Sequence, residues 1–498
     1  MQLREKHEES ETPERPSYSE VESAFRRTTD LALDWLRTSA DPAEPVSACV
    51  PPDRLREILD LDLPAEGTAL ADLMPAIEAY FEYATRTGSP HFLNQLFGGQ
   101  DAAGMLGEVV SAVTNTSMYT YEVAPVATIL ETELVRQMTK LVGFPGGEGL
   151  FVTGGSNANM VAMLCARQRI DAAAKRRGLR GHRYTAFVSE QAHYSFLTAA
   201  NLLGIGTESV VRIPSDGAGR MIPAALDEAI QRDREDGGSP FFVGATAGTT
   251  VLGAFDPLEP IAEIARRHEV WMHVDGAWGA PVLFSEKLRS KVAGAELADS
   301  FAWDAHKLMG VPLLCTAILL REHGSLRAAC SSAGTEYIYH DNPEDSRDLG
   351  PLSLACGRKV DALKLWLAWK HHGVQGYAQR VEHLVALAQD ARRYIDRHPR
   401  LEMMADPEFL NLCFRYVPEA DGLTDDEVDA LNVRIRDRLA GSGRALVNYA
   451  DLEGRVTIHL VLPNADLRLE QVVSLLEEFA VLGRATEADE ADANRDVV

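Results

Sequence analysis

The chain has few positive charges for its size. Among its 498 residues, 49 Lys and Arg stand against 74 Asp and Glu, so the formal net charge is −25. A field of this sign repels nucleic-acid phosphates and anionic lipid headgroups, and we expect neither nucleic acid nor a membrane as a partner. A small anionic ligand held in a locally organised pocket stays compatible with this charge.

Cysteine patterns and long apolar runs are also lacking. The six cysteines include no Cys-x-x-Cys pair and no cluster with histidine, which argues against a disulfide scaffold and a metal site. Residues 1–20 lack the apolar core of a secretory signal, and the longest apolar stretch, at 311–320, is too short to span a bilayer. These absences favour a cytoplasmic protein with reduced thiols.

The composition that is present, 46% hydrophobic and 25% charged, is typical of globular proteins. At ~150 residues per domain the length favours about three domains. The segments we expect are a disordered one at 1–20, a helical one ending in a Gly-rich loop at 21–101, a large domain at 102–375, a smaller α+β domain at 376–484 and an acidic tail at 485–498.

Short apolar runs alternate with helical stretches between residues 102 and 375. The candidate strands are 149–153, 185–189, 209–213, 240–245, 270–274, 300–303 and 316–320, and helices such as 158–173 and 257–267 lie between them. This alternation predicts an α/β fold with a mostly parallel sheet. The elements predicted farther along are helices at 360–371, 376–397, 424–439 and 470–482 and an alternating strand at 456–462.

Three segments of the large domain carry chemically informative residues. Lys307 follows one predicted strand, Asp275 ends another, and the turn Gly154-Gly155-Ser156 joins a strand to a helix. Ligands bind at the carboxyl ends of strands in α/β sheets, and a Gly-rich turn before a helix suits a phosphate. The turn matches neither GxxxxGK[ST] nor GxGxxG, the nucleotide-binding motifs. A lysine amine, a strand-end carboxylate and a phosphate cup together indicate a pyridoxal phosphate enzyme.

Further blocks point to the family that the chain resembles. Between residues 91 and 482 the chain contains, in order, FLNQLFGGQD, NTSMYTYEVAPVATILE, GGSNANM, SEQAHYSF, ATAGTTVLGAFDPLEPIA, HVDGAWG, WDAHKLMGV and CGRKVDALKLWLAWK. With these blocks it resembles the group II pyridoxal-phosphate-dependent amino-acid decarboxylases, most of all the glutamate and cysteine-sulfinate branch. The resemblance implies a fold type I carboxy-lyase that works as a homodimer with active sites shared between subunits.

When the family's motifs are matched to this chain residue by residue, the resemblance implies which residues contact the cofactor ring. Lys307 matches the lysine that forms the Schiff base, and Asp275 matches the carboxylate that keeps the pyridine nitrogen protonated. His193 matches the histidine that stacks on the ring, Ala277 is expected under the opposite face, and Thr246 near the phenolic oxygen.

The resemblance also implies contacts to the phosphate and to the substrate. The implied phosphate contacts are Gly155, Ser156, His306 and, from the second subunit, Cys356. The implied substrate contacts in the loop before residue 101 are Asn94, Gln95 and Phe97. Taken singly, His193 is typical of a satisfied core histidine and Cys356 of a small buried hydrophobe. The ordered blocks favour the functional interpretation.

The chain departs from the family pattern in two loops near the cofactor. Asp304 stands where the family has an asparagine near the phosphate, and a carboxylate there repels phosphate unless it is protonated or turned away, so it receives no role. In the loop that carries the family's proton-donating tyrosine, that position is Pro343. Three candidate donors lie nearby and stay open: Tyr337, Tyr339 and His340.

A third departure concerns the substrate side chain. His459 lies on the predicted strand 456–462, where the acidic-substrate branch has an arginine that binds the side-chain carboxylate. A histidine cannot make the bidentate contact of a guanidinium. We therefore expect α-decarboxylation of a short apolar L-amino acid such as valine, with release of CO2 and a primary amine.

Three alternatives stay open. The substrate can be acidic (glutamate, aspartate or cysteine sulfinate), with another basic group in place of the arginine. If Cα is not protonated, the chain can couple decarboxylation to oxidative deamination and release an aldehyde. The last alternative is an inert cofactor-binding regulator, and the retention of Lys307, Asp275 and His193 argues against it.

Overall fold

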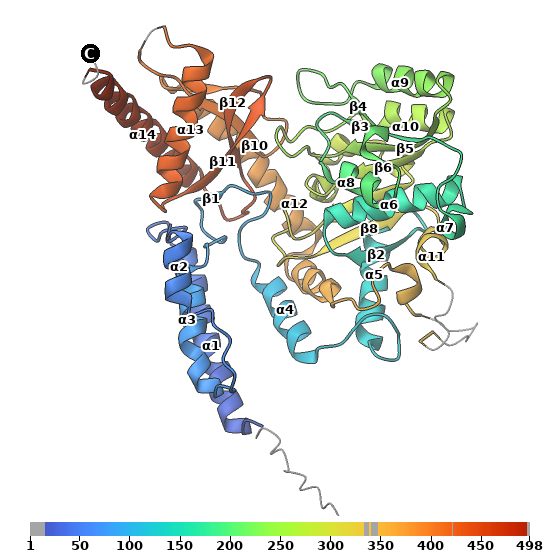
Figure 1. Cartoon of the computed structure of the whole chain (residues 1–498), viewed down its shortest axis with the longest axis horizontal. Helices are drawn as coiled ribbons and strands as arrows, with labels where there is room; N and C mark the ends of the chain where they lie inside the picture. The colour runs from blue at the N-terminus through green and yellow to red at the C-terminus, as the bar shows by residue number, and fades with distance from the viewer. Residues whose placement is uncertain (1–14, 333–337, 340–346, 421, 496–498) are drawn as a thin grey trace, which may run out of the picture.

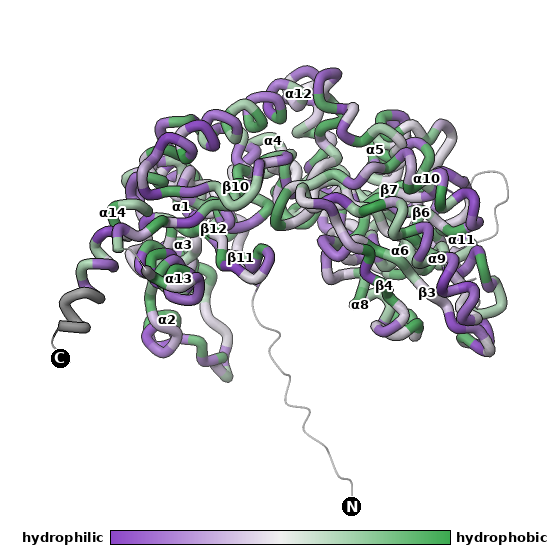
Figure 2. The backbone as a smooth tube through the Cα atoms, turned by 90° about the horizontal axis from the view of Figure 1, so that it is seen from above, coloured by the Kyte–Doolittle hydropathy of each residue, from purple (hydrophilic) through white to green (hydrophobic). Residues whose placement is uncertain are grey.

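Two β-sheets organise the chain (Figure 1). A computed structural model describes residues 15–332, 338–339, 347–420 and 422–495. One sheet has seven strands and the other has five. The long helix α12 (Asp361–Ile395) lies between them and bridges the two halves of the molecule, as the view from above shows (Figure 2).

The seven-stranded sheet forms the large α/β layer. Its strands, in spatial order, are β2 (Glu148–Val152), β8 (Thr316–Leu320), β7 (Ser300–Asp304), β6 (Trp271–Asp275), β5 (Ser239–Thr246), β3 (Tyr184–Ser189) and β4 (Val210–Ile213). The strand β8 runs antiparallel to both of its neighbours, and the other neighbouring pairs are parallel. The predicted α/β fold with a mostly parallel sheet is confirmed.

Helices cover both faces of this sheet, which explains why most residues of its strands are buried. The helices on one face are α5 (Pro125–Val142), α9 (Pro223–Glu235) and α10 (Leu258–Arg267), and those on the other are α6 (Gly155–Ile170), α8 (Ser195–Leu202) and α11 (Ser325–Cys330). Neighbouring strand residues enter different cores, since Phe187 and Val243 belong to the first and Ala186 and Phe242 to the second.

The five-stranded sheet joins the N-terminal part of the chain to the C-terminal part. Its spatial order is β1 (Phe92–Leu93), β11 (Leu446–Leu452), β12 (Arg455–Val461), β10 (Asn411–Tyr416) and β9 (Leu401–Met403). The helices α13 (Asp425–Gly441) and α14 (Leu469–Arg495) accompany it. Because β1 pairs in parallel with β11, the loop before residue 101 is attached to this sheet. The sequence predicted β12 alone among these strands.

The remaining helices are short or lie at the edges. In Figure 1 the N-terminal helices project from the body as an arm. The helices are α1 (Tyr18–Ser39), α2 (Pro52–Leu59), α3 (Met74–Tyr83), α4 (Ala102–Thr114) and α7 (Ala174–Arg177). The 3-10 turns are η1 (Leu70–Leu73), η2 (Thr207–Ser209), η3 (Ala280–Phe284), η4 (Arg289–Val292), η5 (Ala295–Leu297) and η6 (Gly350–Leu352). None of the helices in the described ranges has the length and apolarity needed to cross a membrane.

The chain ends are more ordered than the sequence predicted. Helix α1 begins at Tyr18, inside the segment expected to be disordered, because Ser17 and Glu20 form a capping box. At the other end α14 continues to Arg495, through most of the expected acidic tail. Two acidic side chains have partners there: Glu487 accepts a hydrogen bond from the Tyr416 hydroxyl at 2.5 Å, and Asp489 pairs with Arg438 at 2.6 Å. The two helices predicted on either side of residue 373 are confirmed, because α12 consists of two helical segments that meet at Gly373, whose φ of 66° and ψ of 177° are not helical.

Candidate active site

A cavity of about 320 Å³ opens at the carboxyl ends of β5, β6 and β7, beside the start of α6. The last residues of these strands, Thr246, Asp275 and Asp304, all line it. The sheet register places Thr246 directly beside Asp275. The predicted site residues that the structure brings together around the cavity are Gly155, Ser156, His193, Thr246, Asp275, Ala277, His306 and Lys307.

Asp275 is held in one orientation by hydrogen bonds. Its carboxylate is 6% exposed and accepts hydrogen bonds from Asn159 Nδ2 at 2.8 Å and from the Ala277 amide at 3.1 Å. Asn159 therefore presents its Oδ1 to His273 Nε2, at 2.9 Å. Since an amide oxygen only accepts, Nε2 of His273 carries the proton. Burial lowers the pKa of His273 to about 4, so this histidine is neutral at neutral pH.

This support for Asp275 was not predicted from the sequence, although two signals in the sequence point to it. His273 lies two residues before Asp275 on β6, so their side chains share one face of the sheet. Asn159 lies one helical turn after Gly155 on α6, and so on the same face of that helix. Other missed residues that line the cavity are Leu96, Thr153, Tyr194, Gly248, Thr250, Trp278 and Leu314.

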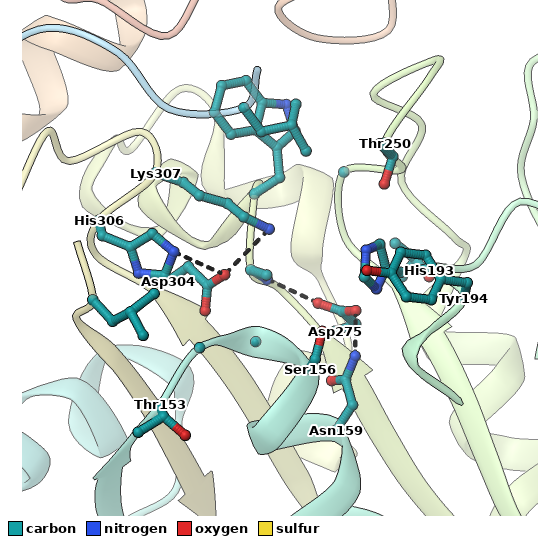
Figure 3. Close-up of a pocket in the computed structure, with 18 residues that line it drawn as sticks. Thr153, Ser156, Asn159, His193, Tyr194, Thr250, Asp275, Asp304, His306 and Lys307 are labelled. Atoms are coloured by element: carbon teal, nitrogen blue, oxygen red, sulfur yellow. Dashed lines mark hydrogen bonds and ion pairs between the residues drawn. The ribbon is translucent and has the colours of Figure 1, made fainter. Parts of the chain in front are cut away.

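His193 and Lys307 face the cavity from opposite sides, with Asp275 between them (Figure 3). His193 Nδ1 accepts a hydrogen bond from the Ser195 amide at 3.3 Å, so its proton is on Nε2. Burial lowers the pKa of His193, and the neighbouring Asp275 charge opposes that effect. The Lys307 Nζ lies 3.2 Å from Asp304 Oδ2, an ion pair across the turn after β7.

The turn at the start of α6 leaves room for a ligand to approach the backbone. Gly154 occupies the N-cap position at φ of 94° and the helix has no side-chain cap. A Cβ on Gly155 would lie 2.8 Å from Asp304 Oδ2 and 3.3 Å from the Ala277 Cβ, so glycine is required there. Uncapped amides at a helix start suit an anion such as a phosphate.

The residues of the cavity fit the cofactor that the sequence predicts. The Thr246 hydroxyl is buried and has no hydrogen-bond partner within the described part of the chain, which leaves it free for a ligand. A carboxylate for the ring nitrogen, a lysine amine for the aldehyde and uncapped amides for the phosphate all line the same cavity. This donor set matches a phosphorylated pyridine aldehyde.

Four predicted contacts lie outside the wall of this cavity. In the substrate-side loop, Leu96 lines the cavity, whereas Gln95 is exposed and the Phe97 ring packs on Phe92 with centroids 5.6 Å apart. Asn94 does not line the cavity either, and Cys356 is exposed on the surface of this single chain. Their roles stay predictions.

His459 also lies behind the wall instead of in it. Its side chain is buried, and Nε2 faces Asn411 Nδ2 at 3.1 Å. Asn411 Nδ2 in turn donates to the carbonyl of Thr250, which lines the cavity, at 2.8 Å. Burial lowers the pKa of His459 to about 4, so it brings no positive charge at neutral pH.

Of the three candidate proton donors, only Tyr339 lies within the residues that the structure describes. Tyr337, His340 and the family's tyrosine position, Pro343, lie outside the described residues. The Tyr339 hydroxyl is described and lies against Gly350 in η6, away from the cavity lining.

Comparisons with known proteins agree with the site. A family model described as pyridoxal-dependent decarboxylase conserved domain matches residues 52–417. Human cysteine sulfinic acid decarboxylase is 35% identical over 475 residues, covering 93% of this chain and 96% of that protein. Human acidic amino acid decarboxylase GADL1 is 35% identical over 456 residues, covering 90% of this chain and 88% of that protein. The crystal structure of mouse CSAD matches with a TM-score of 0.91 at 35% identity, covering 94% of this chain and 99% of that chain.

The family model covers the whole seven-stranded sheet and so includes every strand that borders the cavity. The matches confirm the family, the fold type I architecture and the carboxy-lyase class that the sequence blocks predict. The chain therefore belongs to the pyridoxal-dependent decarboxylases, and its cofactor is pyridoxal phosphate.

Proposed function

We propose that the chain decarboxylates a short acidic L-amino acid, of the size of cysteine sulfinate or aspartate, to CO2 and a primary amine. One observation carries this substrate class: two decarboxylases named for acidic substrates are 35% identical over at least 90% of the chain.

This proposal replaces the sequence-based preference for a valine-like substrate. The relatives indicate acidic amino acids, and the argument from His459 loses its geometric basis because that ring does not line the cavity. The group that does line it is Thr250, which is anchored through Asn411 and offers a hydroxyl. A polar wall of this kind suits a polar side chain better than valine.

The roles of the residues in the reaction follow from their positions. Bound pyridoxal phosphate supplies the electron sink that makes loss of CO2 from an amino acid feasible. Asp275 holds a proton on the pyridine nitrogen, and Asn159 with the neutral His273 keeps the carboxylate aimed at it. His193 and Ala277 fix the tilt of the ring, and Lys307 supplies the amine that holds the cofactor between turnovers.

A competition assay tests the substrate class. Holoenzyme incubated with equimolar L-cysteine sulfinate, L-aspartate, L-glutamate and L-valine is expected to form mainly hypotaurine or β-alanine. Thr250→Val, an isosteric change, is expected to lower kcat/KM for the short acids by about tenfold, the effect of one hydrogen bond to a charged group. Turnover of valine serves as the internal control, because its side chain cannot use the hydroxyl.

Two outcomes of this assay contradict the proposal. Dominant formation of isobutylamine would restore the apolar substrate. An aldehyde with hydrogen peroxide in place of the amine would show oxidative deamination.

We also propose that the enzyme is a homodimer that buries an apolar face. Leu106, Val109 and Val113 recur on one side of α4 and are exposed, as are Val126 and Ile129 on α5. Contiguous exposed apolar surface of this kind marks an interface, and closed pairs are the commonest assembly. Analytical ultracentrifugation of the wild type is expected to give twice the mass of one chain. The Val109→Glu variant is expected to sediment with the mass of a single chain. A wild-type monomer would contradict the dimer.

A further inference from the structure

The proposed roles leave unused one buried carboxylate in the cavity, that of Asp304. Its side chain is at the end of β7 and is 1% exposed. Oδ1 accepts a hydrogen bond from the Thr316 hydroxyl at 2.7 Å, and Oδ2 lies 3.2 Å from Lys307 Nζ. A buried carboxylate needs such a partner, because an unpaired buried charge costs several kcal/mol.

Asp304 also lies where the phosphate is proposed to bind. Its Oδ2 is the atom nearest to a Cβ built on Gly155, at 2.8 Å, so the carboxylate faces the uncapped turn at the start of α6. The other proposed phosphate contact, His306, has Nε2 at 3.7 Å from the same oxygen. A phosphate dianion bound in the turn would therefore lie close to the Asp304 carboxylate. Two negative groups this close repel each other, which disfavours the state in which both are fully ionised.

The surroundings offer little positive charge to offset this repulsion. The titratable and charged side chains around Asp304 in the described part of the chain are Lys307 and His306 from the turn after β7, Asp275 from β6, His193 from the loop after β3 and the buried thiol of Cys315 before β8. Lys364 from α12 acts on the neighbouring His306. Burial lowers the pKa of both His193 and His306, so neither is a strong cation near neutral pH. Lys364 is already paired, at 2.8 Å with Asp361 and 3.0 Å with Glu108.

We propose that Asp304 couples cofactor binding to proton uptake: its carboxylate pairs with Lys307 in the cofactor-free chain and takes up one proton when a phosphate monoester binds at the Gly155–Ser156 turn. The inference rests on the proposed cofactor site. It predicts that the phosphate part of the cofactor binds more tightly as the pH falls, in a way that depends on Asp304.

A pair of ligands isolates the phosphate. Pyridoxine 5′-phosphate and pyridoxine differ only in the phosphate, and neither has an aldehyde that can react with Lys307. Calorimetric titration of the full chain, freed of cofactor, gives the ratio of the two dissociation constants. Ionisation of the ring affects both ligands alike and cancels in this ratio. Between about pH 7.5 and 8.5 the phosphate is a dianion throughout.

In the wild type, the preference for pyridoxine 5′-phosphate over pyridoxine is expected to fall by about tenfold for each unit by which the pH rises across this range. This is the slope that the uptake of one proton on binding requires. Asp304→Asn, which keeps the shape of the side chain, is expected to make the preference independent of pH. At about pH 8, Asp304→Asn is expected to raise the preference for pyridoxine 5′-phosphate by at least about tenfold over the wild type. Asp406→Asn is the matched control, because it removes an exposed carboxylate that pairs with Arg392 on the surface and is expected to leave the ratio unchanged.

The outcomes separate the role of Asp304 from the proposed site. A wild-type preference for the phosphate ligand that does not vary with pH, or that Asp304→Asn leaves unchanged, overturns the role of Asp304 and keeps the phosphate site. Equal affinity for both ligands in wild type and variant overturns the phosphate site and the inference together. The wild-type pH dependence stands as a test even if Asp304→Asn does not fold.

Discussion

Lys307→Ala is expected to lower the decarboxylation rate by at least about 10⁴-fold, the scale seen when a residue that bonds covalently to the reacting group is removed. The physical reason is that the cofactor then lacks both its covalent attachment and the amine that exchanges with the substrate. CO2 release from a short acidic amino acid, measured with excess pyridoxal phosphate, gives the comparison.

Lys287→Ala is the matched control for this prediction. Lys287 is an exposed lysine that pairs with Glu382 on the surface and does not line the cavity. Its loss is expected to change the rate by less than about twofold. If Lys307→Ala retained a rate within about tenfold of wild type, another lysine would hold the cofactor.

The second large effect is expected at Asp275. Asp275→Asn removes the charge that holds a proton on the pyridine nitrogen, and it is expected to lower kcat by about 10²–10³-fold, the usual scale for one preorganised electrostatic contact. Because asparagine has nearly the same shape, the far-ultraviolet circular dichroism is expected to stay unchanged. A variant within about threefold of wild type would show that another group protonates the ring.

Much of the large sheet could be predicted from the sequence because its strands are buried on both faces. The run 270–274, for example, is apolar except for His273, and it corresponds to β6 (Trp271–Asp275). The short strands β1 and β9 have no such pattern, since two or three residues carry no periodic signal. Their pairing comes from contacts between distant parts of the chain, such as Phe92 with Leu446.

Most of the cavity residues that the sequence motifs predicted lie together in the structure. These motifs stand at the ends of neighbouring strands, and the order of the strands in the sheet fixes where the backbone of each motif lies. The direction of a side chain is harder to predict, as the loop at 94–97 shows. The resemblance pointed to Asn94, Gln95 and Phe97 as substrate contacts, whereas Leu96 is the residue of this loop that lines the cavity. His459 illustrates the same limit. The resemblance placed it at the substrate side chain, yet Asn411 and Thr250 lie between its ring and the cavity.

Borohydride reduction of the holoenzyme, followed by peptide mapping, tests the central claim most directly, because it fixes the cofactor to the lysine that holds it. The account predicts one pyridoxyl group per chain, on Lys307, beside the carboxylates Asp304 and Asp275 that line the same cavity. A pyridoxyl group on any other lysine, or none after loading with pyridoxal phosphate, would contradict the account.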